Sequence, residues 1–286
     1  MTTSTAVTRT RPRAAARRRT PFRTKAGVAL GVLVVLTTVV GPWLVDASPY
    51  AIDVTHRFGG PSAAHWLGTD ELGRDVAGRL AAGARSTALV AFGAVAIASA
   101  IALPLGVLTG FLGGWVDLVV TRVVDLFFAI PSLLVAIGVV GLFGASLTTT
   151  VLALGLSYWP FYTRLVRATV VSIRSRPYAD ALRVLGASRL RMVRTDVLTG
   201  LTPLMLVQTT VLLGFAILDE AALGFLGLGV QPPQASWGSH LAESREFITT
   251  HPELALVAGV PIAITVFAIN LLSDALRDRL DAKRIS

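Results

Sequence analysis

The chain of 286 residues is 53% hydrophobic and only 15% charged, and its mean hydropathy is +0.67. Soluble domains carry about 25% charged residues, so this composition argues against an ordinary soluble protein and indicates a membrane protein. No cysteine is present, which excludes a disulfide framework, a thiolate metal site and cysteine catalysis.

The first 25 residues form a basic tail with eight Lys and Arg residues and no acid. Such a tail, in a chain of net charge +9, is also compatible with a nucleic-acid-binding arm. An apolar run follows it directly, however, and basic residues beside a membrane span hold that end in the cytoplasm and attract anionic lipid. We therefore predict a cytoplasmic tail over residues 1–25 that contacts membrane lipid, and no nucleic-acid partner.

Six apolar runs have the roughly 20-residue length that a membrane-spanning helix needs. The first, Gly27–Val45, is free of charge and longer than the ~7–15-residue core of a cleaved signal peptide, so we predict that it is retained. The other five runs are Thr87–Leu112, Leu126–Gly144, Leu147–Thr163, Leu204–Leu218 and Leu254–Leu272.

These runs predict an all-α integral membrane protein with six transmembrane helices. Residues 26–46 form the first helix, residues 47–85 an external loop, residues 86–275 a five-helix core and residues 276–286 a C-terminal tail. With the N-terminus inside, the cytoplasmic pieces hold 21 of the 26 Lys and Arg residues. This bias predicts that both termini are cytoplasmic.

Glycines recur at helical spacing in two of the predicted spans. Gly106 and Gly110 lie in one, and Gly138, Gly141 and Gly144 lie in the next. Small residues at such spacing let membrane helices approach closely. We predict close helix packing at both sets.

The cytoplasmic segment over residues 174–198 contains two short amphipathic stretches. Pro177 suits the first turn of a helix and Gly186 suits its end, and the residues between them form an apolar stripe of Tyr178, Ala181, Leu182 and Leu185. This helix is too short to span, so its stripe rests on the bilayer surface or on a partner protein. The second stretch, with Leu190, Val193 and Val197 among arginines, predicts a helix at the lipid interface.

The first stretch carries a family resemblance. Asp180–Ser188 reads Asp-Ala-Leu-Arg-Val-Leu-Gly-Ala-Ser and resembles the Glu-Ala-Ala-x-x-x-Gly loop of ABC importer permeases. Leu182 replaces the second alanine, and Leu198-Thr199 stands where the family often has Leu-Pro. The resemblance implies that this loop docks into a groove of a separate ATPase subunit, through Tyr178, Asp180, Ala181, Leu182, Arg183, Leu185, Gly186, Ala187 and Ser188.

Two longer motifs resemble the dipeptide, oligopeptide and nickel branch of that family, in particular its C-type permease. One is His65–Val76, with the core Leu-Gly-Thr-Asp-Glu-Leu-Gly-Arg-Asp. The other is Glu220–Pro233, which closes with Ser236-Trp237-Gly238. The resemblance implies the type I ABC importer permease fold in a bacterial inner membrane. It also implies three kinds of partner: a homologous second permease subunit, two ATP-binding cassette subunits and an extracytoplasmic substrate-binding protein. Transport would proceed by alternating access.

Other classes of function were weighed against this one. The glycines of Gly224–Gly229 lack the strand, helix and Gly-Lys-Ser/Thr that a nucleotide site needs, so we predict no ATP site in this chain. An intramembrane enzyme would need converging acids, a Ser–His pair or a metal set within the spans, but all four histidines fall in external loops. We predict no catalytic residue, metal or cofactor. A channel would leave the cytoplasmic stripe unexplained.

The substrate remains open between di- or oligopeptides and nickel, the latter as a chelate. A bare transition metal favours imidazole, thioether or thiolate ligands, and the spans contain no histidine or cysteine and only Met205 near a span. We favour peptides, which need a wide and weakly polar route. The residues that could line such a route are Ser157, Tyr158, Gln208, Thr209 and Thr210.

Overall fold

The computed structural model describes residue 29, residues 48–177, residue 186 and residues 188–285. Within these ranges the chain is helical, and its only extended pairing is an isolated bridge between Thr69 and Asp75. The predicted first span lies outside the described residues except for residue 29, and most of the predicted docking helix, residues 178–185, does so as well.

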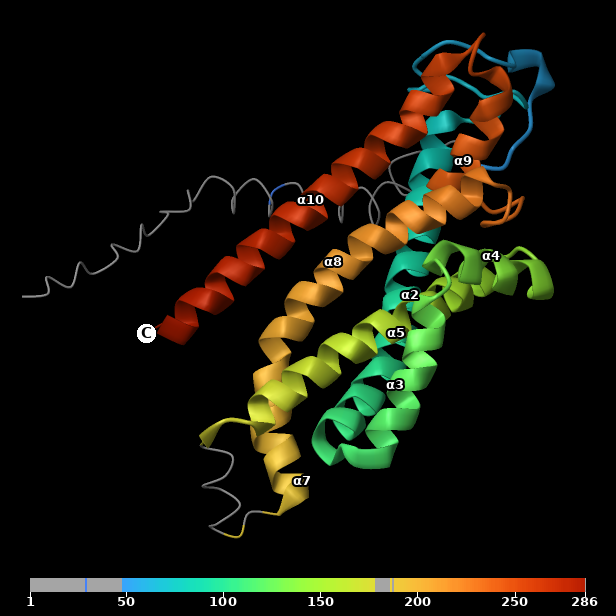
Figure 1. The fold of residues 1–286 in the computed structure, drawn as a ribbon. Helices are drawn as coiled ribbons and strands as arrows, with labels where there is room; N and C mark the ends of the chain where they lie inside the picture. Colours follow the sequence, from blue (N-terminus) through green and yellow to red (C-terminus); the bar gives the residue numbers. More distant parts are fainter. Residues whose placement is uncertain (1–28, 30–47, 178–185, 187, 286) are drawn as a thin grey trace, which may run out of the picture.

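Two long helices form the centre of the bundle (Figure 1). They are α2 (Val76–Leu112) and α5 (Leu147–Arg174), and each has a proline inside it, Pro104 and Pro160. A Cβ atom on Gly106 would lie 2.6 Å from the Val166 side chain, and one on Gly110 would lie 2.7 Å from that of Val170. The prediction of close packing at these two glycines is confirmed, since only glycine allows α2 and α5 to approach this closely.

The third predicted span is not one straight helix. The predicted span Leu126–Gly144 contains only the end of α3 (Gly114–Phe128), together with α4 (Ser132–Phe143). The two helices are bent by 86° at the break between them. Pro131 precedes α4 with ψ at 133° and has no N–H group, so the α-helical hydrogen-bond ladder is interrupted there. Two arginines of α5 hold α3 in place, with Arg167 paired to Asp117 and Arg164 to Asp125 at 2.6 Å.

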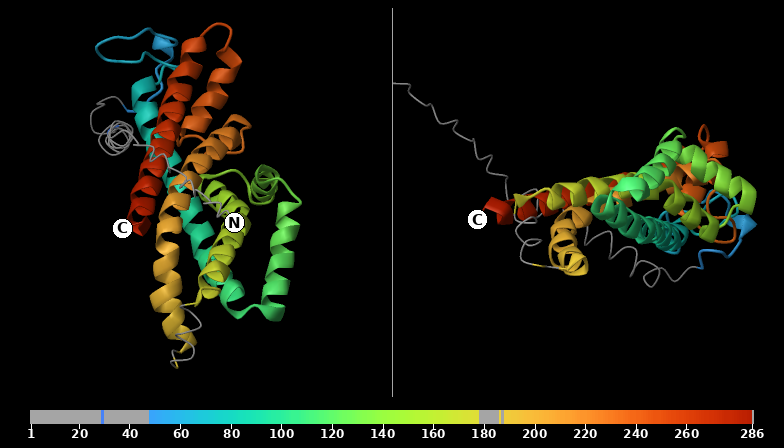
Figure 2. Two further views of the ribbon diagram at one scale, coloured as in Figure 1. Left: turned by 60° about the vertical axis from the view of Figure 1, so that its left-hand side comes forward. Right: turned by 60° about the horizontal axis from the view of Figure 1, so that its bottom comes forward.

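A near-continuous helical rod begins at Arg189. It consists of α7 (Arg189–Met192), the π-helical turn η2 (Val193–Val197) and α8 (Leu198–Phe225), and α10 (Pro252–Ile285) packs beside it (Figures 1 and 2). The stretch Leu190–Val197 is therefore not a separate helix but belongs to the beginning of this rod. Val197 is buried in a core cluster with Val166, Val170, Ile173 and Leu201, and this burial draws the stretch into the bundle.

A lobe of loops and short helices closes one end of the bundle. It contains residues 48–75 with η1 (Val54–His56), and residues 226–251 with α9 (Trp237–Ser244) and η3 (Arg245–Phe247), and Figure 1 shows these two segments at the same end of the bundle, with α9 beside the first turns of α10. We call this region the outer lobe. Its first segment, residues 48–75, leads directly into α2, which begins at Val76, earlier than the predicted span Thr87–Leu112.

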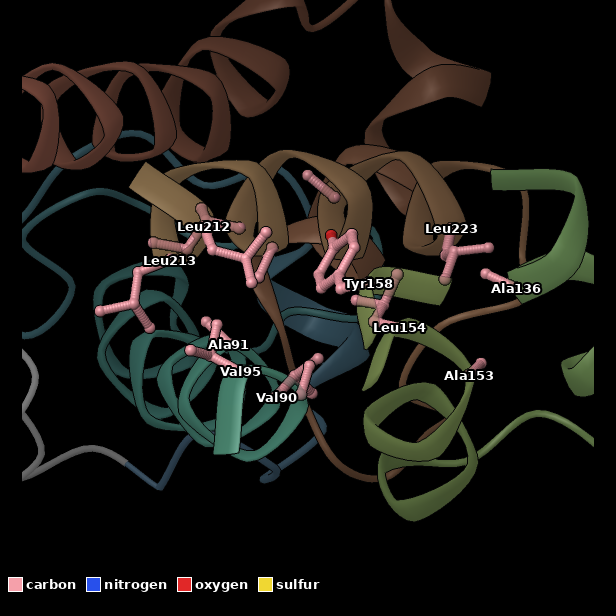
Figure 3. Close-up of a cluster of buried hydrophobic side chains, with 14 of the residues drawn as sticks. Val90, Ala91, Val95, Ala136, Ala153, Leu154, Tyr158, Leu212, Leu213 and Leu223 are labelled. Atoms are coloured by element: carbon pink, nitrogen blue, oxygen red, sulfur yellow. The ribbon is translucent and has the colours of Figure 1, made fainter. Parts of the chain in front are cut away.

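Three helices in the described part of the chain are long and apolar enough to cross a membrane: Val76–Leu112, Val193–Phe225 and Pro252–Leu280. The bent pair α3 and α4 brings the number to four if it counts as one span. The main apolar core lies where α2, α4, α5 and α8 meet, and Figure 3 shows side chains such as Val90, Leu154 and Leu212 gathered there.

The second glycine set, Gly138, Gly141 and Gly144, makes no close contact with the described residues. A Cβ atom on Gly138, Gly141 or Gly144 would meet nothing within 4 Å among the described residues. Exposed Leu142 and Phe143 lie on the same helix end, 82% and 76% accessible. The prediction of close packing at this set does not hold within the described part of the chain.

Candidate functional site

The break between α3 and α4 opens a pocket against α5 and α8. Because α4 turns away at Pro131, the last aromatic residues of α3 face α5 across a cavity of about 430 Å³. We call this the aromatic pocket. Its lining comes from three places: Phe127, Phe128, Ile130, Pro131, Ser132 and Val135 at the break; Ser157, Tyr158, Pro160 and Phe161 of α5; and Leu212, Phe215 and Asp219 of α8.

One carboxylate lies in this otherwise apolar and aromatic pocket. The Tyr158 hydroxyl donates a hydrogen bond to Asp219 Oδ2 at 2.7 Å, which joins α5 to α8. Tyr158 is buried and Asp219 is partly buried. Figure 3 shows Tyr158 projecting from α5 into the core beside α8. The neighbouring Ser157 donates to the Ala153 carbonyl of its own helix at 2.7 Å, so its hydroxyl is already satisfied.

The five residues predicted to line the pathway do not all lie in one place in the structure. Ser157 and Tyr158 line the aromatic pocket. Thr209 lies further along α8, where its hydroxyl is 2.7 Å from that of Tyr162. Thr210 faces α10 and bonds with the Ser273 hydroxyl at 3.1 Å, and Gln208 is half-buried. Of the five, only the α5 pair lines this pocket, because α8 contributes Leu212, Phe215 and Asp219, which lie nearer its C-terminal end than residues 208–210.

Asp219 was not among the predicted pathway residues. The sequence signal that could have identified it was an acid inside an apolar stretch, since such a residue is costly in a membrane and marks a functional position. Its partner, Tyr158, was predicted from α5. Their pairing could not be read from the sequence because it depends on how α5 and α8 cross.

The neighbouring acid, Glu220, belongs to a packed junction and not to the pocket. Its side chain is fully buried and accepts a hydrogen bond from the Thr87 hydroxyl of α2 at 3.0 Å. The Trp237 amide of α9 donates to the same hydroxyl at 3.2 Å. A Cβ on Gly224 would lie 2.5 Å from the Gly238 backbone. The residues of the Glu220–Gly238 motif therefore lock α8 and α9 against α2.

The His65–Val76 motif contributes to an ion-pair network in the outer lobe. Arg74 bonds to Asp70 at 2.7 Å and to Glu71 at 2.8 Å, and both Arg74 and Arg79 reach Glu243. The oxygens of Asp70, Glu71 and Glu243 lie close enough to hold a cation. Two guanidinium groups already engage these carboxylates, however, so we assign the cluster to holding residues 70–79 against α9.

A buried histidine lies beside this network. Burial lowers the pKa of His240 to about 3, and the positive charges of Arg79 and Arg74 act in the same direction. His240 is therefore neutral at physiological pH. Burial raises the pKa of Glu71 in the same lobe, where Asp70 and Glu243 add repulsion.

The predicted docking segment is only partly visible in the structure. Tyr178, Asp180, Ala181, Leu182, Arg183, Leu185 and Ala187 lie outside the described residues. Gly186 has φ at +79°, a left-handed conformation that favours glycine, and both Gly186 and Ser188 are exposed. Both lie directly before α7, at the start of the rod that ends in α8.

The fold and the pocket define a class: a helical membrane protein with a cavity between its helices and no nucleotide-binding motif in its sequence. A family model described as "Binding-protein-dependent transport system inner membrane component" matches residues 102–286. The chain belongs to this family.

Curated relatives agree with the family assignment. The probable D,D-dipeptide transport system permease protein of Escherichia coli K12 is 39% identical over 252 residues, which cover 88% of this chain and 85% of the relative. A dipeptide transport system permease protein of Alkalihalophilus pseudofirmus is 38% identical, over 87% of this chain and 82% of its own. A nickel transport system permease protein of E. coli K12 is also 38% identical, over 89% and 91%. This chain is thus a permease of the dipeptide, nickel and peptide type.

Proposed function

We propose that the chain is one permease subunit of an ATP-driven importer for di- or oligopeptides. The observation that carries this proposal is its membership of a family named for binding-protein-dependent transport. Energy would come from two separate ATP-binding cassette subunits, and substrate from an extracytoplasmic binding protein. A homologous second permease would complete the pathway in a heterodimer.

The arrangement in the membrane follows from the same family. The candidate spans of the described part, together with α5 and the apolar run Gly27–Val45, would give six crossings of the type I importer fold. The Lys and Arg bias supports cytoplasmic termini. The outer lobe would then face the binding protein, and the segment before α7 would face the ATPase subunits.

The rod from α7 to α8 suggests how ATP binding by the partner subunits moves one wall of the pocket. It begins beside Ser188 in the docking segment and runs through Asp219 to Phe225. A nearly continuous helix transmits a displacement at one end to the other as a rigid body. ATP binding would draw the ATPase subunits together and shift the docked segment, and the rod would tilt the α8 wall of the aromatic pocket. The cavity would thereby alternate between outward and inward openings.

The aromatic pocket favours peptides over nickel as the substrate. Its cavity of about 430 Å³ falls in the range of sites for small organic ligands. Its lining includes no histidine, methionine or cysteine, whereas nickel sites favour nitrogen and sulfur ligands. Relatives named for dipeptide and for nickel transport are equally similar, so the pocket and not the similarity supports this choice.

Growth and uptake in cells test the proposal. A peptide-requiring auxotroph that lacks this subunit should stop growing on dipeptide, and the wild-type gene should restore growth. Leu182→Asp, which places a charge on the docking stripe, should not restore it. Arg122→Met is the matched control, because it changes the net charge by the same amount at an exposed position outside the docking segment.

Nickel accumulation is measured in the same strains. Peptide use that is unchanged by loss of the subunit, together with lost nickel accumulation, would overturn the peptide assignment. Normal transport by Leu182→Asp at normal expression would remove the docking segment from the mechanism.

A further inference from the structure

We propose that the aromatic pocket binds the ammonium group at the N-terminus of the transported peptide, with Asp219 as its counter-ion. This inference rests on the proposed function, which supplies the peptide. It adds a recognition step inside the permease itself and names the residues that perform it.

Asp219 differs from the two aspartates of α3 in its partners. Asp117 and Asp125 are each paired with an arginine of α5. In the described part of the chain, Asp219 takes part in no salt bridge, and its hydrogen bond from Tyr158 engages Oδ2 alone. A partly buried carboxylate without a cation is costly in a membrane helix. A ligand cation would supply the missing charge.

The walls around Asp219 suit an ammonium group. Tyr158, Phe127, Phe161 and Phe215 line the cavity with it, and aromatic faces attract cations through their quadrupole. Phe128, also in the lining, already has the Arg164 guanidinium 3.9 Å from its ring centre. One wall of the pocket therefore engages a cation in the structure as it stands.

The donor set distinguishes an ammonium group from a metal ion. An ammonium group needs one carboxylate and a few oxygen acceptors, which Asp219 and the Tyr158 hydroxyl provide. A divalent metal needs several converging ligands, but Asp219 is the only acid in the lining. The remaining volume accommodates the peptide backbone against apolar walls that impose little side-chain selectivity.

This chain has no native cysteine, so a single cysteine placed in it can be followed as maleimide labelling of its own gel band in the whole importer complex in lipid nanodiscs. Ser132→Cys places a reporter thiol on the exposed rim of the pocket. Its rate of reaction with a maleimide is measured with the chain otherwise wild type or carrying Asp219→Asn, Asp219→Glu or Asp274→Asn. Asp274 is an exposed acid of α10 outside the pocket and serves as the charge-matched control. The probes are dialanine, N-acetyl-dialanine and nickel chloride.

Dialanine should slow labelling in the wild-type and Asp274→Asn backgrounds, and N-acetyl-dialanine and nickel chloride should not. Asp219→Asn should weaken protection by dialanine roughly tenfold or more, the usual effect of losing a charge-assisted hydrogen bond. Asp219→Glu should retain part of it. Equal protection by dialanine and N-acetyl-dialanine, or undiminished protection in Asp219→Asn, would overturn the inference.

Uptake by the same preparations separates this inference from the proposed function. If the wild-type complex accumulates dialanine and Asp219→Asn accumulates it equally well, the ammonium site is wrong and the importer stands. If the wild-type complex takes up nickel but no dialanine, the peptide function itself is wrong. Assembly of each variant is checked by co-purification of the ATPase subunits, and Asp219→Glu serves if Asp219→Asn fails to assemble.

Discussion

The outer lobe and the aromatic pocket both contain buried or partly buried acids, but the partners of these acids differ. In the lobe, Asp70 and Glu243 are neutralised by Arg74 and Arg79, and glycines bring backbones into direct contact. In the pocket, the Tyr158 hydroxyl is the hydrogen-bond partner of Asp219, and the surrounding side chains enclose a cavity. Ion pairs and backbone contacts hold the lobe rigid, whereas the pocket offers a ligand both a cavity and a carboxylate. Substitutions should therefore reduce stability in the lobe and transport in the pocket.

The largest effect is expected at the contact between α8 and α9. Gly224→Leu would force a side chain into the Gly238 backbone, 2.5 Å from the position of its Cβ. Backbone cannot yield as a flexible side chain does, so we expect a loss of roughly 3 kcal/mol or more in the free energy of unfolding. Thermal unfolding of the complex in detergent measures it. Gly138→Ala, which meets nothing within 4 Å, should change stability by less than about 0.5 kcal/mol.

A comparable loss is expected when the ion-pair network loses one partner. Arg79 is almost fully buried, and Arg79→Met would leave Glu243 and Asp70 short of a cation, at a cost of about 3–5 kcal/mol. The double variant Arg79→Met, Glu243→Gln should be less destabilised than the sum of its single variants. Arg122→Met removes an exposed arginine and serves as the control. Strict additivity in this cycle would contradict the network.

A moderate pH effect is expected from His240. Its pKa is about 3 in the folded protein against an ordinary 6.5, so the unfolded chain binds the extra proton between these values. Stability from this residue is complete above pH 6.5 and falls as the pH falls toward 3, by up to about 2 kcal/mol between pH 7 and pH 5. Melting of wild-type and His240→Gln complexes across this range tests the sign. A variant with an unchanged pH slope would refute the assignment.

The smallest effect on stability is expected at Tyr158. Tyr158→Phe removes the hydrogen bond to Asp219, which is worth about 1 kcal/mol, and keeps the ring in the core. Dipeptide uptake should fall more than thermal stability does, because the hydroxyl orients the carboxylate that meets the substrate. Tyr162→Phe, which loses its contact with Thr209, should lower stability similarly and leave uptake near wild type. Equal effects of the two variants on uptake would contradict a special role for Tyr158.

The sequence predicted those features that depend on local spacing. Gly106 and Gly110 lie one helical turn apart, and their close packing was predicted from that spacing, but a similar spacing at Gly138, Gly141 and Gly144 gives no close contact among the described residues. Pro131 lies inside the apolar run Leu126–Gly144, but hydrophobicity alone does not show whether a helix kinks or breaks at a proline, so the 86° turn and the pocket beside it were not predicted. The stretch around Val197 appeared interfacial because its burial depends on Val166 and Val170, which are distant in sequence. Asp219 and Tyr158 meet only through the crossing of α5 and α8.

The central claim is that this chain carries peptides through a membrane on energy supplied by partner ATPases. The most direct test is accumulation of labelled dialanine in proteoliposomes containing the complete importer, its binding protein and ATP, with and without this subunit. The account predicts ATP-dependent accumulation that requires this subunit and is lost with Leu182→Asp. Accumulation that proceeds without ATP, or without this subunit, would contradict it.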